Sequence, residues 1–135
     1  IKEENNLIYW LQEVYTPIDK LLGQIINYFN LAIKILSADP YDDELMESFC
    51  NYISNSQKKL EKVEKLYRSI KTPIAAKDFS ISLYHCLSLV QDAINEIDMY
   101  TMGYVDNYLH DGKEIINKAK QRRIKLKEDR KKLTI

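Results

Sequence analysis

The chain has 135 residues, of which 45% are apolar, enough for one domain with its own core. Three Gly and three Pro leave few places for tight turns, so the composition favours a few long helices and excludes a strand-rich fold. Charge is balanced at 20 Lys and Arg against 20 Asp and Glu, and no apolar run reaches the roughly 20 residues that cross a bilayer, which predicts no transmembrane segment.

The first predicted helix covers residues 4–37, where apolar residues recur at steps of three and four, as on the buried face of a bundle helix. Thr16-Pro17 interrupts this segment, because Pro17 lacks a backbone donor and crowds the preceding turn. The apolar seam keeps its phase across Pro17. The sequence therefore favours one kinked helix over two separate helices.

A second helix is predicted to begin after Ser37, with Asp39 as its cap and Pro40 in its first turn. Charged residues such as Glu61 and Lys65 occupy its outer positions, which is typical of a solvated face. The apolar positions follow an almost strict heptad: Leu45, Phe49, Tyr52 or Ile53, Ser56, Leu60, Val63, Tyr67 and Ile70.

The third helix is predicted over Thr72–Ile97, with Thr72 as its cap and Pro73 in its first turn. Its end is expected between Asp98 and Gly103. The apolar seam of this segment needs partners on the other helices: Phe79, Leu83, Cys86 or Leu87, Val90, Ala93 or Ile94, and Ile97.

The fourth segment ends in a basic stretch, since residues 113–135 hold ten Lys or Arg against three acidic residues, a net of +7. Gly112 and Ala119 stand where bulk is expected and would allow a close approach to a neighbouring helix. The residues on one face are Val105, Leu109, Gly112, Ile116, Ala119, Arg123 and Leu126. Residues 119–135 are predicted as a basic helical extension whose last dozen residues extend beyond the core or fray.

Together these segments predict a single all-α domain over residues 1–135, an antiparallel up-down four-helix bundle with a Pro-kinked first helix. Helices of this length span about 40 to 50 Å at about 1.5 Å per residue, so the domain is expected to be a rod. The heptad seams are compatible with a monomer or a dimer.

Candidate chemistry is sparse. The paired Glu-x-x-His spacing of di-iron bundles is absent, and Asp106, His110 and Glu114 share a helix face that is more typical of a solvated stripe. His85 and Cys86 are adjacent, so on a helix they point about 100° apart. We therefore expect no enzymatic activity, no metal and no cofactor. Cys50 and Cys86 lie on different predicted helices, and packed free thiols are favoured over a disulfide.

Two surfaces are candidates for partner binding. Tyr100, Tyr104 and Tyr108 are spaced as a helical stripe, which is more often the packed edge of a core than an exposed partner surface. The basic C-terminal residues could attract nucleic acid phosphates or an anionic membrane or wall polymer, although a solvated helix end explains them as well. The basic candidates are Lys120, Arg122, Arg123 and Lys127.

From Thr72 to Lys118 the order of a Pro, AAKDF, an apolar seam, a break and LHDGKEIINKA resembles small helical-bundle proteins of Bacillus-type bacteria. Many of these are predicted secreted proteins or lipoproteins of unknown function. The resemblance implies no catalytic residues and favours the cell envelope. Because cells rarely remove an initiator Met before a bulky residue such as Ile1, we also expect a missing upstream segment, either a leader or a disordered or tag segment.

The sequence thus predicts a non-catalytic binding or structural module, extracellular or anchored at a bacterial cell envelope, with a protein or an envelope component as partner. The alternative is a cytoplasmic or phage-type accessory protein that contacts nucleic acid or a protein through the basic C-terminal helix. Nucleic acid is the less favoured partner, because the basic segment lacks interleaved aromatic residues.

Overall fold

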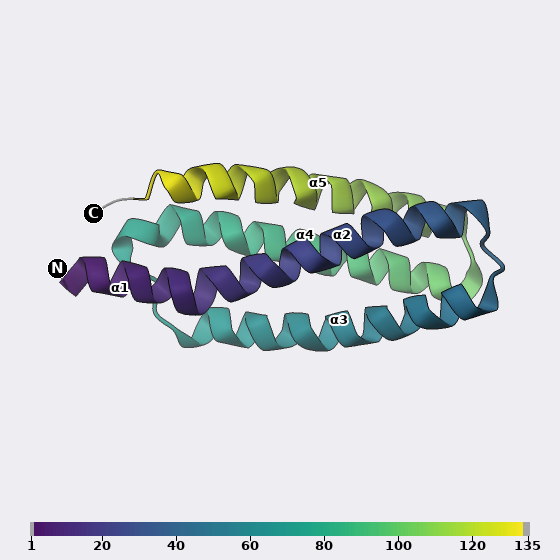
Figure 1. The fold of residues 1–135 in the computed structure, drawn as a ribbon, viewed down its shortest axis with the longest axis horizontal. Helices are drawn as coiled ribbons and strands as arrows, with labels where there is room; N and C mark the ends of the chain where they lie inside the picture. Colours follow the sequence, from purple (N-terminus) through teal and green to yellow (C-terminus); the bar gives the residue numbers. More distant parts are fainter. Residues whose placement is uncertain (1, 134–135) are drawn as a thin grey trace.

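A computed structural model of the chain describes residues 2–133, which form an elongated all-helical bundle (Figure 1). The first long helix consists of α1 (Lys2–Trp10), a π-helical turn (Leu11–Tyr15) and α2 (Thr16–Ala38). It is followed by α3 (Asp43–Ser69), α4 (Lys77–Gly103) and α5 (Asp106–Lys131). Successive long helices run in opposite directions along the bundle (Figure 1). The predicted antiparallel four-helix bundle is confirmed.

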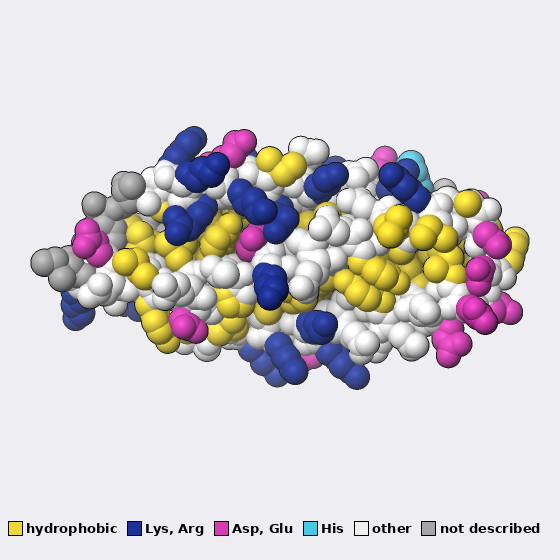
Figure 2. All heavy atoms as spheres, viewed as in Figure 1, with side chains coloured by type: hydrophobic (Ala, Val, Ile, Leu, Met, Phe, Trp, Pro, Cys, Tyr) yellow, Lys and Arg dark blue, Asp and Glu magenta, His cyan; other side chains and the backbone are white. Residues whose placement is uncertain are grey.

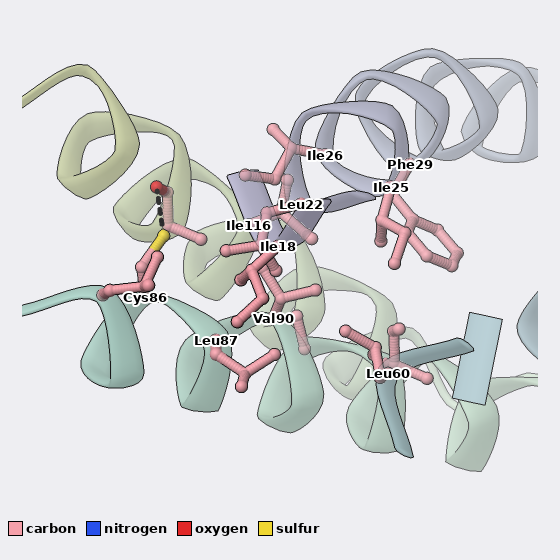
Figure 3. Close-up of a cluster of buried hydrophobic side chains, with 14 of the residues drawn as sticks. Ile18, Leu22, Ile25, Ile26, Phe29, Leu60, Cys86, Leu87, Val90 and Ile116 are labelled. Atoms are coloured by element: carbon pink, nitrogen blue, oxygen red, sulfur yellow. Dashed lines mark hydrogen bonds between the residues drawn. The ribbon is translucent and has the colours of Figure 1, made fainter. Parts of the chain in front are cut away.

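The core runs through the whole bundle as one cluster to which all the helices contribute. The apolar spacing in each segment identified most of its buried residues, including Ser56, which is 3% exposed on α3. Figure 3 shows the middle of this cluster, where side chains of α2 face those of α4 and α5. Its labelled members include Ile18, Leu22, Leu87, Val90 and Ile116.

Pro17 lies two residues after the π-helical turn, as the second residue of α2, and does not end the helix. The Thr16 N–H and the Thr16 hydroxyl both donate to the Leu11 carbonyl, the hydroxyl at 2.9 Å. A π-helical turn is a common way of fitting an irregularity into an α-helix without ending it. The predicted continuity across Pro17 is confirmed, whereas the π-helical turn was not predicted.

The start of α3 differs from the prediction, because the cap is Asp42 and not Asp39. The Asp42 side chain accepts from the Leu45 N–H at 3.0 Å, which satisfies one of the free donors at the helix start. Asp39 instead follows the end of α2 and donates its N–H to the Ile35 carbonyl at 3.1 Å. The turn between the two helices is therefore longer than expected.

The start of α4 also differs, since α4 begins at Lys77 after a short 3₁₀ turn (Ile74–Ala76). Thr72 does not cap it. Its hydroxyl oxygen lies 3.4 Å from Ser80 Oγ instead. Pro73 has an extended backbone, with ψ of 152°, and a residue before Pro is itself driven away from the helical region. The helix therefore starts later than predicted.

The helices α4 and α5 pack closely, as Gly112 and Ala119 predicted. A Cβ at Gly112 would lie 2.6 Å from Ile97 Cγ1, so a side chain here would push the helices apart. Ala119 is fully buried, and its carbonyl accepts from Cys86 Sγ at 3.5 Å (Figure 3).

The C-terminal end of α5 stays on the bundle. The helix continues to Lys131, and Leu126 is 2% exposed. The structure thus differs from the expectation that the last dozen residues leave the core or fray, although Thr134 and Ile135 lie outside the described residues. The prediction was wrong because Leu126 is a single buried apolar residue among many charged ones, which does not produce a recognisable helical spacing of apolar residues.

The first helix, taken as Lys2–Ala38, is long and apolar enough to cross a membrane by length and composition alone, with a mean hydropathy of 1.3 over its most apolar window. The sequence had predicted no such segment, because charged residues interrupt every long apolar run. Half of that window is buried inside the bundle, and the core helix of a helical bundle passes the same test.

Candidate functional site

One end of the bundle is strongly acidic. It carries the α2–α3 and α4–α5 connections, and we call it the acidic tip, residues 34–47 and 96–114. These residues include ten Asp or Glu and only two Lys, a net of −8, whereas the rest of the chain carries +8. Figure 2 shows acidic side chains at this end, on the right, and Lys and Arg over the middle and left.

The acidic tip also exposes large apolar side chains. Tyr41 is 78% exposed and Met102 is 72% exposed, and Met99, Tyr104 and Val105 are exposed as well. All three methionines of the chain belong to the acidic tip, since Met46 packs into the core there. Single exposed apolar residues are normal, but several at one end of a small domain are typical of interaction surfaces.

An aromatic chain leads from this surface into the core. The Tyr41 and Tyr104 ring centroids lie 6.0 Å apart, and Tyr104 meets Tyr100 edge-on at 5.8 Å. Tyr100 is 1% exposed, and burial is the main cause that raises the pKa of its phenol. Tyr41 of the α2–α3 connection thus contacts Tyr104 of the α4–α5 connection, and Tyr104 packs against the buried Tyr100 ring.

Tyr104 ends α4 in the left-handed conformation, with φ of 56°, and its N–H donates to the Tyr100 carbonyl at 2.8 Å. Within residues 2–133 it is the only residue other than Gly with a positive φ. Glycine is the usual residue at this position, because a Cβ costs about 1 kcal/mol or more in that region. Strain of this kind tends to occur at functional sites.

A hollow of about 320 Å³ lies within the acidic tip, between the end of α2 and the start of α5. Leu36, Tyr100 and Leu109 form its apolar lining, and Asp106 and Lys113 line it as well. Such a hollow could receive one apolar or basic side chain of a partner.

The predicted tyrosine stripe does not exist as one helical row, because α4 ends before Tyr104. Tyr100 lies in the core, Tyr104 in the connection, and Tyr108 half-buried on α5. Sequence reasoning missed Tyr41 and Met102, which only the fold brings to the same end. Gly103 was the available signal for the break in the row.

The predicted basic residues divide into two kinds. Lys120, Arg122 and Lys127 are exposed. Arg123 instead binds Asp19 of α2, with its Nε 2.9 Å from Oδ1 and its Nη2 3.3 Å from Oδ2. Arg123 therefore joins α5 to α2 and does not offer a free charge.

Two residues, Gly23 and Tyr15, lie close to this ion pair. Gly23 leaves room for the Arg123 guanidinium, because a Cβ at Gly23 would lie 2.5 Å from Nη2. Burial, followed by the charge of Asp19, raises the pKa of Tyr15 to about 12. The role of Arg123 was not visible in the sequence, because Asp19 and Gly23 lie far from it along the chain.

A groove of about 590 Å³ lies between α4 and α5, near their basic end. Leu89 and Leu126 line it together with Lys118, Arg122 and Lys125. Of the predicted basic residues only Arg122 takes part. Lys118 and Lys125 were missed because the sequence predicted the packed face of α5 but not which helix packs against it.

Of the residues weighed for metal binding, His110 and Glu114 lie together on the surface of α5, with His110 Nε2 3.3 Å from Glu114 Oε1. Among residues 2–133 no three His, Cys, Asp or Glu side chains are placed to hold a metal ion. His85 is exposed, while Cys86 is buried, which raises the pKa of its thiol to about 11. Cys50 and Cys86 are both free thiols, as predicted, although Cys50 is exposed.

The fold and these surfaces define a helical-bundle domain with an acidic, apolar end and a basic groove. The chain belongs to the family of C-terminal domains of cyanobacterial DnaJ chaperones, which matches residues 2–134. No curated protein and no solved structure has a significant match to the chain.

The family corrects the resemblance to secreted or lipoprotein-like proteins of Bacillus-type bacteria, which is wrong. That resemblance relied on the pattern from Thr72 to Lys118, which the bundle itself explains. The seam packs in the core, and Gly112 permits the contact of α5 with Ile97. Both features are explained by helix packing, so they do not identify a family.

Proposed function

We propose that this domain is the non-catalytic, protein-binding C-terminal module of a DnaJ-type chaperone. The observation that carries the proposal is the family match, which covers residues 2–134 and so includes every described residue. A chaperone module must hold other polypeptides, and its binding surface therefore has to offer apolar contact.

The described surface is suited to this role in two places. The acidic tip exposes Tyr41 and Met102. Apolar Leu89 and Leu126 line the groove between α4 and α5 together with Lys118 and Arg122. Methionine side chains adapt to differently shaped partners because they are flexible and polarisable. The exposed apolar side chains of both surfaces support protein binding more directly than they support catalysis.

A cell-envelope location has no remaining support, because it rested on the resemblance that the family match corrects. Contact with nucleic acid through the basic end loses one of its four candidate residues, since Arg123 is already paired with Asp19, and the basic segment lacks interleaved aromatic residues. The partner that we propose is therefore a protein.

The test is suppression of aggregation. Citrate synthase, denatured in guanidinium and diluted into buffer, aggregates and scatters light, and we expect the 135-residue chain at equimolar concentration to reduce that scattering. An unrelated helical protein of the same size should leave it unchanged. Unchanged scattering with the chain, together with no binding of the denatured protein in a fluorescence anisotropy titration, would contradict the proposed function.

A further inference from the structure

We propose that the acidic tip is a docking surface for a basic, apolar segment of a partner protein. This inference rests on the proposed protein-binding function and names the class of partner. It combines three properties of one end of the bundle: exposed apolar side chains, a strained connection that holds them, and a large negative charge.

The contact surface is made by Tyr41, Met99, Met102, Tyr104 and Val105. Tyr41 packs against Tyr104, and Tyr104 packs edge-on against the buried ring of Tyr100, so the aromatic part of the surface is assembled before a partner arrives. Fixed aromatic side chains lose little conformational entropy on binding, and aromatic residues are enriched where binding energy is concentrated. Met102 supplies the adaptable part of the contact.

The negative charge needs an explanation beyond the stability of the helices. Asp42, Asp43 and Glu44 at the start of α3 and Asp106 at the start of α5 complement the positive ends of those helices. Asp39 does not, because it lies at the carboxyl end of α2, where negative charge is unfavourable. Asp98 lies within α4, before its last turn, and does not complement a helix start either. The remaining acids of the tip lie outside the first turns.

Charge complementarity selects the occupant. A net of −8 attracts a segment rich in Lys or Arg and repels an acidic one, and the exposed Tyr and Met side chains need apolar residues in that segment. The chain's own basic α5 end cannot reach the tip, because it lies at the opposite end of the bundle (Figure 1). The occupant therefore lies outside residues 2–133, and we assign it to a partner protein.

Two pairs of variants test the contact. Tyr41→Ser with Met102→Ser removes two side chains that are more than 70% exposed, and Ile8→Ser with Ile74→Ser is its control at the other end, where the side chains are 52% and 92% exposed. Glu47→Gln with Asp111→Asn removes two exposed charges from the tip, and Glu61→Gln with Glu128→Gln removes two exposed charges elsewhere. Circular dichroism should show that all four fold.

The probe is a fluorescein-labelled synthetic peptide of 16 residues with Lys and Leu placed to form a basic amphipathic helix. We expect anisotropy to show binding that weakens as salt is raised. Tyr41→Ser/Met102→Ser should weaken it at least about tenfold, and Glu47→Gln/Asp111→Asn about threefold or more at low salt. Both control variants should bind like the unmodified chain.

Three results would overturn the proposal. A peptide with Glu in place of Lys could bind equally well, the tip variants could bind like the controls, or sedimentation could show that the tip pairs with a second copy of the chain and excludes the peptide. The citrate synthase assay separates this inference from the proposed function. If Tyr41→Ser/Met102→Ser still suppresses aggregation and still binds the peptide, the docking surface is contradicted and the chaperone role stands. If the peptide binds at the tip but the chain does not suppress aggregation, the chaperone role is contradicted and the docking surface stands.

Discussion

Tyr104 shows how one residue can determine the geometry of a surface. Its left-handed conformation ends α4, turns the chain toward α5 and places its ring between Tyr41 and Tyr100. A glycine would adopt the same backbone without strain and would lose both ring contacts. Tyr at this position therefore accepts a strained backbone conformation and gains aromatic contacts that Gly could not make.

A pair of substitutions separates these two effects. Tyr104→Gly and Tyr104→Ala both remove the ring, but only Ala keeps the Cβ that opposes a positive φ, so we expect Tyr104→Gly to be about 1 kcal/mol more stable than Tyr104→Ala. Urea unfolding followed by ellipticity measures the difference. The same pair at Lys120, exposed within α5, should show the opposite order. Equal stability of the two Tyr104 variants would show that the conformation costs nothing.

At the scale of elements, α3 is joined to α4 by a small polar network around Glu64. The Glu64 carboxylate accepts from Arg68 Nη2 at 3.0 Å on its own helix, and from Gln91 Nε2 at 3.2 Å and the Tyr84 hydroxyl at 3.4 Å on α4. The hydrogen bond from Arg68, followed by that from Gln91, holds the pKa of Glu64 below its ordinary value of 4.5.

This network predicts a pH-dependent contribution to stability. Because folding lowers the pKa of Glu64, its ionised form stabilises the fold above the ordinary pKa, and that contribution is lost as pH falls through the lowered pKa. Glu64→Gln should therefore cost a few tenths of a kcal/mol at pH 7 and nothing once Glu64 is protonated. Chemical unfolding from pH 7 to 2.5 measures the difference, with exposed Glu61→Gln as the control. A cost that does not change with pH would contradict the role of the charge.

The helical seams could be predicted because burial on one face leaves apolar residues at steps of three and four, and that spacing survives in the sequence. The caps could not be placed as well. Asp39 and Asp42 are equally good cap residues, and only the length of the turn decides between them. The contact of Tyr41 with Tyr104 and that of Asp19 with Arg123 are tertiary contacts with no local pattern in the sequence. The sequence therefore named only Tyr104 of the exposed aromatic pair and only Arg122 of the basic residues that line the groove.

At the scale of the whole molecule, a single core extends from Leu7 to Leu126, so the bundle should unfold as one unit. The single Trp10 reports one end of that core, and Cys86 lies fully buried in it with a raised pKa. Trp10 fluorescence, ellipticity and alkylation of Cys86 should therefore follow the same denaturant dependence.

The two thiols provide the comparison for that prediction. Exposed Cys50 should react with a maleimide in the folded chain, whereas Cys50→Ser should leave a protein that is labelled only on unfolding. Mass spectrometry after timed labelling distinguishes one modified thiol from two. Rapid labelling of Cys86 in native buffer would show that α4 and α5 separate locally, without global unfolding.

The division of charge between the two ends has a consequence for how the molecule approaches other bodies. A neutral rod with −8 at one end and +8 over the remainder has a large permanent dipole moment. Near a polyanion such a rod rotates before contact, so that its basic part faces the polyanion and Tyr41 and Met102 face away from it. Within a Debye length of about 8 Å at physiological salt, the field thus selects an orientation, although the net charge gives no overall attraction.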